Sequence, residues 1–190
     1  MDGSLFKGNK ILLAALDGET DAQIEATWTH DPDFSQLITA DPVRPLYAAQ
    51  VKKKYEEIAK EEATRYRFGI RTLDEDRLIG FVDLRWIEWT NGSSWLSMGI
   101  GKPVDRGHGY GSEALRMLTE YAFDELNLYR ISAMVSEYNQ RAIHLLETRA
   151  FRREVCQREA IHRFGRRWDN YIYELSVQDW KATRERGEAQ

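Results

Sequence analysis

The sequence is poor in cysteine and has no long apolar run. Its 190 residues include one cysteine, Cys156, so no disulfide can form within the chain, and a reducing compartment is favoured. No apolar stretch approaches the roughly 20 residues that a helix needs to cross a bilayer. Residues 1–9 also lack the apolar segment of a signal peptide. We therefore expect a cytoplasmic protein that does not associate with a membrane.

An excess of positive charge is missing as well. The chain has 27 Lys and Arg against 31 Asp and Glu, a formal net charge of -4. Domains that bind nucleic acid usually carry a basic excess, so nucleic acid is not an expected partner. A small anion held by a local basic site stays possible. Six Trp, nine Tyr and seven Phe supply enough apolar surface for the core of one domain of ordinary size.

Hydrophobic periodicity predicts a strand, two helices, three strands, a helix, a strand, a helix and two strands. The predicted strands are Lys10–Ala15, Arg65–Leu73, Leu78–Trp89, Ser94–Gly101, Tyr129–Val135, Phe151–His162 and Arg167–Val177, and the predicted helices are 20–28, 45–62, 111–127 and 141–149. Thr20 and Gln23 have the spacing of a capping box, and Asp31-Pro32 is expected to end the first helix. Asn91-Gly92 predicts a hairpin. This order indicates an α/β protein with helices on a mixed sheet.

Two strands show clear alternation. In the second, Tyr66, Phe68 and Ile70 face one way and Arg65, Arg67 and Arg71 face the other. An arginine face could attract an acidic substrate, but such a run is more often solvated and paired with Glu or Asp. In the third strand, the residues expected on one face are Leu78, Val82, Leu84 and Trp86.

The most informative segment runs from Met98 to Ser112. A predicted strand leads into Arg106, then Gly107, Gly109 and Gly111 alternate with other residues, and a helix begins. Glycine lets backbone N–H groups turn toward a ligand with no Cβ in the way. Exposed N–H groups at a helix start, together with the helix dipole, form an anion site. Arg106 adds a charge that can pair with a phosphate. Pyrophosphate is the anion that such a loop fits best.

Three other interpretations of this segment are weaker. A tight turn without a ligand does not need three alternating glycines. A P-loop closes with a Lys-Ser/Thr pair, which is missing here. The fingerprint of a dinucleotide binder has a different glycine spacing, although Glu137 does lie just past the following strand.

This segment resembles the coenzyme motif of the GNAT acetyltransferases, Gln/Arg-x-x-Gly-x-Gly/Ala, at Arg106, Gly109 and Gly111. The resemblance is to the branch of ribosomal-protein N-terminal and spermidine-type acetyltransferases. Segments of the chain that look like this branch are Gly99–Gly101, Gly109–Ala114, Ala122–Leu128, Tyr138–Ala142 and Asp179-Trp180. The similarity covers about Lys10 to Trp180 and is strongest from Met98 to Phe151.

The resemblance implies a single-domain, GNAT-like α/β fold, with a mixed, mostly antiparallel sheet, a central splayed strand pair and flanking helices. Acetyl-CoA would lie in the wedge between the splayed strands. Backbone groups near Met98 and Ile100 would bind the pantetheine arm and polarise the thioester carbonyl, and Asn139 would bond to the same arm. A cap of the helix at Ala142 explains Asn139 equally well. The expected coenzyme-binding residues are Met98, Gly99, Ile100, Arg106, Gly107, His108, Gly109, Tyr110, Gly111, Ser112 and Asn139.

The implied reaction is direct attack of a primary amine on acetyl-CoA. The acceptor would be a protein N-terminus, a polyamine, an amino acid or a drug-like amine. Because a free alkylamine has a pKa of about 10.4, a base must help to remove its proton. Glu88 and Asp83 are the candidates named for this role, ahead of His108, His144 and His162. Asp83 has apolar sequence neighbours, so its pKa would be raised if it is buried among them.

The family pattern has a gap at the general acid. Many members have a Tyr one residue before the Glu of the short helix, but Leu146 precedes Glu147 here, and Ala150 replaces a usual Gly. The thiolate could leave unassisted, since its thiol has a pKa of about 8.5. Alternatively, Tyr138 could donate the proton. A third possibility is that the chain is a non-catalytic acyl-CoA-binding or sensory domain.

The remaining predictions concern the acceptor and the organisation of the chain. Trp86, Trp89 and Trp95 flank the predicted hairpin and could line an acceptor pocket, or could equally form core or homodimer contacts. Cys156 is expected to be an inert core residue. The predicted organisation is an N-terminal extension, 1–9, an N-acetyltransferase domain, 10–180, and a polar C-terminal tail, 181–190. Acetyl-CoA is the expected cosubstrate, and no metal is expected.

Overall fold

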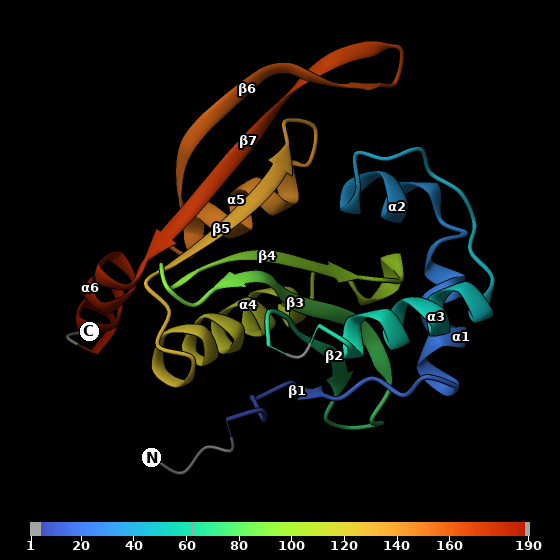
Figure 1. The fold of residues 1–190 in the computed structure, drawn as a ribbon, viewed down its shortest axis with the longest axis horizontal. Coiled ribbons are helices and arrows are strands. Elements are labelled where there is room, and N and C mark those ends of the chain that lie inside the picture. The colour runs from blue at the N-terminus through green and yellow to red at the C-terminus, as the bar shows by residue number, and fades with distance from the viewer. Residues whose placement is uncertain (1–4, 62, 189–190) are drawn as a thin grey trace. The chain divides into compact units, whose positions relative to one another are not determined.

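The computed structural model describes residues 5–61 and 63–188. Seven strands form one sheet in the order β1-β2-β3-β4-β5-β7-β6 (Figure 1). The strands are β1 (Ile11–Ala14), β2 (Tyr66–Thr72), β3 (Leu78–Glu88), β4 (Ser93–Ile100), β5 (Arg130–Ser136), β6 (Arg152–Arg163) and β7 (Arg166–Ser176). The β4–β5 pair is parallel, whereas β1–β2, β2–β3, β5–β7 and β6–β7 are antiparallel. The predicted mixed, mostly antiparallel sheet is therefore confirmed.

The chain divides into two compact units. The first contains the chain up to Trp86 together with Ser97–Leu118, and the second contains Ile87–Leu96 and the chain from Thr119 onward. The register between β4 and β5 runs from the pair Ser93–Arg130 to the pair Leu96–Ala133, and β4 continues for four more residues to Ile100. The last half of β4 thus belongs to the first unit, with the glycine loop.

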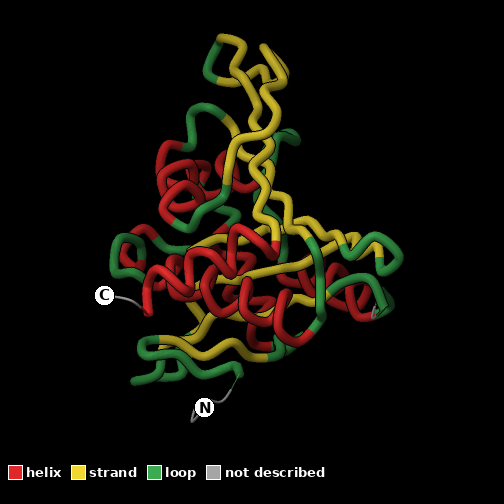
Figure 2. The backbone as a smooth tube through the Cα atoms, turned by 90° about the vertical axis from the view of Figure 1, so that its left-hand side faces the viewer, coloured by secondary structure: helices red, strands yellow, loops and turns green. Residues whose placement is uncertain are grey.

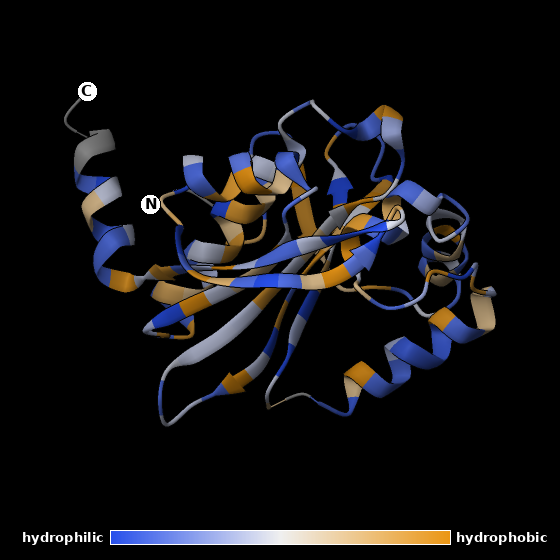
Figure 3. Ribbon diagram, turned by 90° about the horizontal axis from the view of Figure 1, so that it is seen from above, coloured by the Kyte–Doolittle hydropathy of each residue, from blue (hydrophilic) through white to orange (hydrophobic). Residues whose placement is uncertain are grey.

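The first unit contains α1 (Thr20–Trp28), α2 (Pro32–Ile38), α3 (Ala48–Ala59) and α4 (Tyr110–Glu120). Apolar residues of α1 and α3 pack together in a cluster formed by Ala22, Ala26, Val51 and Tyr55. In Figure 3, α3 at the lower right carries blue and orange residues on the same helix, as expected for an amphipathic helix with one buried side. A second cluster joins Trp28 and Phe34 to Leu78 and Phe81 of β3.

α1 spans the predicted residues but has a different cap, and α2 was not predicted. Asp17, not Thr20, closes the start of α1: its carboxylate accepts bonds from the backbone N–H groups of Glu19 and Thr20 at 2.9 and 2.6 Å. The predicted capping box is wrong because the Thr20 hydroxyl donates to that same carboxylate. Asp31-Pro32 opens α2, which was not predicted. Asp31 is its N-cap, accepting from the N–H of Asp33 at 3.0 Å, and proline suits the first helical position.

The second unit is built on β5, β7 and β6, with α5 (Gln140–Thr148) and α6 (Val177–Glu188). The hairpin of β6 and β7 is long, and Figure 2 shows its two yellow strands twisting around each other. Phe164 and Gly165 both have positive φ at its tip, 55° and 73°, which is the backbone of a type I′ turn. The predicted hairpin around Gly165 is confirmed.

Several local expectations are wrong. Trp86 has a φ of 54° and is 59% exposed, so it leaves the buried face that Leu78, Val82 and Leu84 share. Cys156 is exposed on β6 rather than buried in the core. A π-helical turn, η2 (Tyr121–Glu125), follows α4 and buries Phe123 there.

The predicted domain boundaries stay predictions. α6 continues through Lys181 to Glu188, where a polar tail was expected, and residues 189–190 lie outside the described part of the chain. Residues 1–4 of the predicted N-terminal extension also lie outside it. Within that extension, Lys7 forms an isolated antiparallel bridge with Leu12.

Candidate functional site

The glycine loop connects the end of β4 to the start of α4 within the first unit. A short 3-10 turn, η1 (Pro103–Asp105), leads to Arg106, and α4 begins at Tyr110. Gly107 and Gly109 have φ values of 85° and 87°, a backbone conformation that side-chain-bearing residues rarely adopt. The sequence prediction of a strand, a glycine loop and a helix start is confirmed. The N–H groups of the first turn of α4 have no helical partners of their own and can bind an anion.

Met98, Ile100 and Gly111 meet where β4 faces the start of α4. A Cβ on Gly111 would lie 3.6 Å from Met98 Cε and 3.8 Å from Ile100 Cγ1, an ordinary van der Waals contact. The rings of His108 and Tyr110 stack with centroids 5.9 Å apart. The structure thus brings together the members of the predicted coenzyme set that lie between Met98 and Ser112.

The Gly-Ile-Gly run at the end of β4 has a packing reason. A Cβ on Gly99 would lie 2.6 Å from Cδ1 of Ile38, and a Cβ on Gly101 would lie 2.3 Å from the ring of Trp28. Glycine at these positions therefore lets the end of α1 and the side chains of α2 approach β4 closely. α2 becomes a candidate wall over the strand that is expected to bind the thioester.

Arg106 has a different environment from the one expected. Its Nε donates to the carbonyl oxygen of Ile100 at 3.2 Å, and its Nη2 donates to that of Gly101 at 2.6 Å. The same Nη2 lies 3.2 Å from the Asp31 carboxylate at the start of α2. The guanidinium is thus an internal brace that ties the loop to β4 and α2, and Asp31 already balances its charge.

Lys10 lies at the glycine loop and was not singled out from the sequence. Its Nζ donates to the carbonyl oxygen of His108 at 3.0 Å. The segment before β1 is held there by Glu113 of α4, whose carboxylate accepts from the N–H groups of Asn9 and Lys10 at 2.5 and 2.9 Å. No local pattern in the sequence could have indicated this contact, because Lys10 and His108 are 98 residues apart.

Asp83 is buried, but among arginines instead of apolar side chains. Nε and Nη2 of Arg65 donate to its two oxygens at 3.1 and 2.6 Å, and Nη1 of Arg67 lies 3.6 Å from Oδ2. Both carboxylate oxygens of Asp83 are thus already engaged by arginine side chains. The geometry therefore does not favour Asp83 as the general base.

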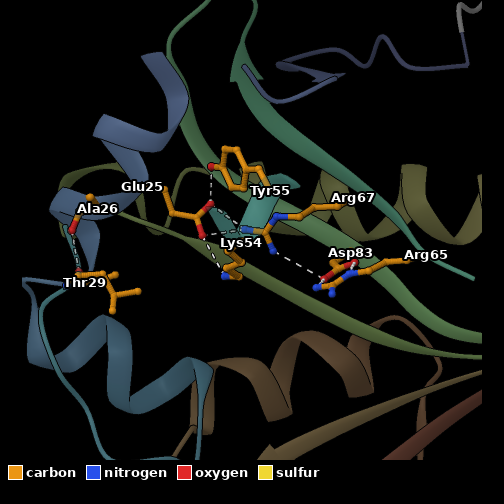
Figure 4. A network of polar contacts seen from close by, with 9 residues as sticks. Glu25, Ala26, Thr29, Lys54, Tyr55, Arg65, Arg67 and Asp83 are labelled. Carbon is orange, nitrogen blue, oxygen red and sulfur yellow. Dashed lines mark hydrogen bonds and ion pairs between the residues drawn. The ribbon is translucent and has the colours of Figure 1, made fainter. Parts of the chain in front are cut away.

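The expected pairing of the arginine face of β2 with Glu and Asp is confirmed, but the expected solvation is wrong: the side chains of Arg65, Arg67 and Arg71 are only 14%, 4% and 17% exposed. Figure 4 shows Glu25 surrounded by Tyr55, Lys54 and Arg67, with Arg67 also directed toward Asp83. Nη2 of Arg67 donates to both Glu25 oxygens at 2.9 and 2.7 Å, and the Tyr55 hydroxyl donates to Glu25 at 2.7 Å. Burial alone would raise the pKa of Glu25, but the charges of Arg67 and Lys54 and the Tyr55 hydrogen bond outweigh it and leave this pKa lowered.

A cavity of about 330 Å³ lies next to this network. Its lining residues come from α3, from β2 and from the segments beside β1 and β2: Ala15, Leu16, Tyr55, Ile58, Ala59, Arg65, Tyr66, Arg67 and Phe68. The two arginines among them already hold Glu25 and Asp83. The cavity therefore offers mainly apolar surface.

Glu88 and the three tryptophans occupy the β3–β4 hairpin and the strands beside it. Glu88 is exposed, and its Oε2 accepts from Asn91 Nδ2 at 3.1 Å and from Ser93 Oγ at 3.3 Å, bonds that brace the hairpin turn. Trp89 is 48% exposed and Trp95 is partly buried. In the first unit, the guanidinium of Arg85 lies over the ring of Trp86, 4.5 Å from its centroid.

In the second unit, Asn139 caps α5 by accepting from the Ala142 N–H at 3.2 Å, which confirms the capping role. Tyr138 packs edge-on against Phe164 and Trp168, with centroid distances of 5.5 and 5.4 Å. The expected coenzyme contact of Asn139 and proton donation by Tyr138 stay predictions.

Leu146, at the usual position of the family's acid, is buried. Beside it along α5, Glu147 accepts a bond from the hydroxyl of Tyr173 at 2.8 Å. Burial and this hydrogen bond raise the pKa of Tyr173 to about 12. Tyr173 therefore keeps its proton at neutral pH, and sequence patterns gave no indication of it.

Among the residues that the structure describes, no three His, Cys, Asp or Glu side chains form a group suited to hold a metal ion. None of the helices in 5–61 and 63–188 is long and apolar enough to cross a membrane.

The fold and the glycine loop define a class of protein that binds an acyl-coenzyme A on an α/β scaffold, and comparisons with known proteins agree. Residues 10–152 match the family model described as the acetyltransferase (GNAT) domain. The probable N-acetyltransferase YjcK of Bacillus subtilis (strain 168) is 31% identical over 166 residues, which cover 83% of this chain and 88% of that protein. The putative ribosomal N-acetyltransferase YdaF of the same organism is 25% identical over 143 residues, 75% of this chain and 74% of that one.

Among solved structures, the chain is similar to the spermidine N-acetyltransferase from Vibrio cholerae in complex with CoA and spermine. The TM-score is 0.81 at 21% identity, covering 92% of this chain and 99% of that chain. The chain belongs to the GNAT acetyltransferase family. It is an acetyl-CoA-dependent N-acetyltransferase of that family.

Proposed function

We propose that the protein transfers an acetyl group to a primary amine by direct attack of the amine on the thioester of acetyl-CoA. The observation that carries this proposal is the β4–loop–α4 geometry, in which Gly107 and Gly109 adopt positive φ immediately before α4. The loop and the first turn of α4 would take the pyrophosphate. Backbone N–H groups at Met98 and Ile100 would bind the pantetheine arm and stabilise the oxyanion that forms at the thioester carbonyl.

The acceptor amine would lie beside the end of β4, with α2 as one wall of its site. Phe34 and Ile38 of α2 are the side chains closest to a Cβ built on Gly99, so this wall is apolar. An apolar wall disfavours the charged form of an amine and lowers its pKa, which generates the attacking neutral form with less help from a base. This suits a chain in which Asp83 is held by two arginines and Glu88 braces a hairpin. The thiolate would then leave unassisted or take a proton from Tyr138.

The relatives indicate only which classes of acceptor should be tested first. The Vibrio cholerae enzyme was solved with spermine, and YdaF is described as a ribosomal N-acetyltransferase. We therefore propose a polyamine or a peptide N-terminus as the first acceptors to test, followed by amino acids and drug-like amines.

The test begins with calorimetric titration of the purified protein with acetyl-CoA, using NADH as the control ligand. Binding of acetyl-CoA alone supports the loop assignment. Free thiol release is then measured with spermidine, a peptide with a free N-terminus and an N-terminally blocked peptide. Release with a free amine supports the proposal. Tight coenzyme binding without release on any amine would instead favour the non-catalytic acyl-CoA-binding domain, and binding of NADH would favour a dinucleotide site.

A further inference from the structure

The loop arginine that the motif predicts for phosphate binding is already engaged. Arg106 donates to the carbonyl oxygens of Ile100 and Gly101 and lies 3.2 Å from the Asp31 carboxylate. Only 17% of its side chain is exposed. Its Nε and Nη2 donors are used in holding the loop to β4 and α2, and Asp31 already balances its charge. A different cation is better placed to bind the ligand at this loop.

Lys10 is that cation. Its Nζ lies 3.0 Å from the carbonyl oxygen of His108, and a Cβ on Gly109 would lie 3.3 Å from the same nitrogen. The ammonium group therefore lies directly against His108 and Gly109, the last two residues of the loop before α4 begins at Tyr110. An ammonium group has three donors, and the contact with His108 uses one of them. Within residues 5–61 and 63–188, no carboxylate lies within 4.0 Å of Lys10 Nζ, so its charge is not balanced by an ion pair.

The carboxylates near this loop are directed elsewhere. Glu113 accepts from the N–H groups of Asn9 and Lys10, and Asp105 is held by Arg77 at 2.8 and 3.0 Å. Asp31 pairs with Arg106. The positive charge of Lys10 therefore adds to the N–H groups and dipole of α4 at the place where an anion would bind. The backbone of Lys10 is fixed by Glu113, which limits the entropy lost when the side chain binds a ligand.

We propose that Lys10, in the segment just before β1, binds the pyrophosphate of the coenzyme at the glycine loop and is a specificity-determining residue for acetyl-CoA. This inference rests on the proposed function, because the loop must be the coenzyme site. Lys10 lies 96 positions before Arg106 in the chain and outside the motif. The fold alone brings it to the loop.

The experiment compares Lys10→Gln and Lys10→Arg with the wild-type protein, and uses Lys7→Gln as a matched control. Lys7 lies in the same N-terminal segment, is exposed, and loses the same charge. Glutamine keeps a donor for the His108 carbonyl but not the charge, whereas arginine keeps the charge. Affinity for acetyl-CoA is measured by calorimetry at two salt concentrations, and again with 3′-dephospho-CoA. Turnover is measured with acetyl-CoA and with acetyl-pantetheine, which has no phosphate.

We expect Lys10→Gln to weaken acetyl-CoA binding about tenfold, the effect of losing one hydrogen bond to a charged group. Lys10→Arg and Lys7→Gln should bind within about twofold of wild type. The loss in Lys10→Gln should be the same with 3′-dephospho-CoA and absent with acetyl-pantetheine. The affinity of wild type should also fall more steeply with salt than that of Lys10→Gln.

Three results would overturn the inference. Wild-type affinity in Lys10→Gln would mean that Lys10 only holds the loop carbonyl. A loss that disappears with 3′-dephospho-CoA would assign Lys10 to the 3′-phosphate instead. An equal loss of turnover with acetyl-pantetheine would indicate a general disturbance of the fold. If the wild-type protein itself fails to bind acetyl-CoA, the proposed coenzyme site fails, which is a separate outcome from a silent Lys10 in a protein that binds.

Discussion

Replacing Arg67 with Met should destabilise the protein strongly, and in a way that depends on pH. Arg67 donates to both oxygens of Glu25 and lies 3.6 Å from Asp83, and the exposed fractions of these three side chains are 4%, 5% and 1%. Its guanidinium also lies over the ring of Phe81, 3.9 Å from the centroid. Methionine fills similar space but leaves the buried charge of Glu25 with only Lys54 and Tyr55 as partners.

The magnitude follows from the cost of an unpaired buried charge. Removing one partner of a buried ion pair costs about 3–5 kcal/mol. We therefore expect the free energy of unfolding to fall by about 4 kcal/mol near pH 7.5, out of roughly 5–15 kcal/mol for a typical protein. The midpoint of thermal unfolding should fall by about 10 °C, since each kcal/mol shifts it by about 2–4 °C in a chain of this size.

The sign of the pH dependence separates this mechanism from simple loss of packing. In the wild type, the pKa of Glu25 is lowered, so its charge stabilises the fold above the unfolded pKa of about 4.3, and this stabilisation is lost as pH falls through the folded pKa. Without Arg67, burial dominates and raises that pKa. The charged Glu25 carboxylate then destabilises the variant at neutral pH. Protonation of this carboxylate at lower pH removes the destabilisation. The cost of Arg67→Met should therefore shrink between pH 7.5 and pH 5, by about 1.4 kcal/mol for each unit of pKa shift.

Urea unfolding at several pH values measures this effect. Arg152→Met is the matched control, because Arg152 is 68% exposed and pairs with Asp179 on the surface, so it should cost less than about 1 kcal/mol. A double variant, Arg67→Met with Glu25→Gln, should recover part of the loss at pH 7.5. If Arg67→Met costs no more than the control, or if its cost is the same at pH 5 and 7.5, the buried network does not contribute in this way.

Three other substitutions test the loop and its packing. A Cβ on Gly107 would have free space, but the backbone φ of 85° is unfavourable for alanine. We therefore expect Gly107→Ala to lower the free energy of unfolding in urea by about 1 kcal/mol and to weaken acetyl-CoA binding. Unchanged affinity would argue that the loop conformation is not needed for the coenzyme. Gly101→Ala would place a Cβ 2.3 Å from the Trp28 ring and should cost about 1–3 kcal/mol, visible as a lower thermal midpoint, and an unshifted midpoint would contradict that close approach. Arg106→Met should lower stability by about 2 kcal/mol as well as coenzyme affinity, because it frees Asp31 and two carbonyl groups. Loss of coenzyme affinity in Arg106→Met at unchanged stability would instead restore the direct phosphate contact that the motif predicts.

Local patterns in the sequence predicted the elements that build the site. The alternation of apolar residues located β2 and β5, the Asn91-Gly92 hairpin signal located β4, and the glycines located the loop between β4 and α4. The turn at Gly165 was predictable because a two-residue hairpin favours glycine at its positive φ. These signals succeed because backbone conformation depends mainly on a residue and its near neighbours. The short α2 was missed because Asp31-Pro32 can follow one helix and also open the next.

The sequence alone determined the fold class, the glycine loop and the family. Only the tertiary structure decided which partners the charged side chains have. Arg67 meets Glu25 across 42 residues, Arg106 meets Asp31 across 75, and Lys10 meets His108 across 98. Periodic patterns in the sequence do not predict contacts between residues so far apart in the chain, because these contacts depend on how α1, α2, β1 and α4 pack against the sheet. The burial of Asp83 between two arginines, and the placement of Lys10 at the loop, are consequences of that packing.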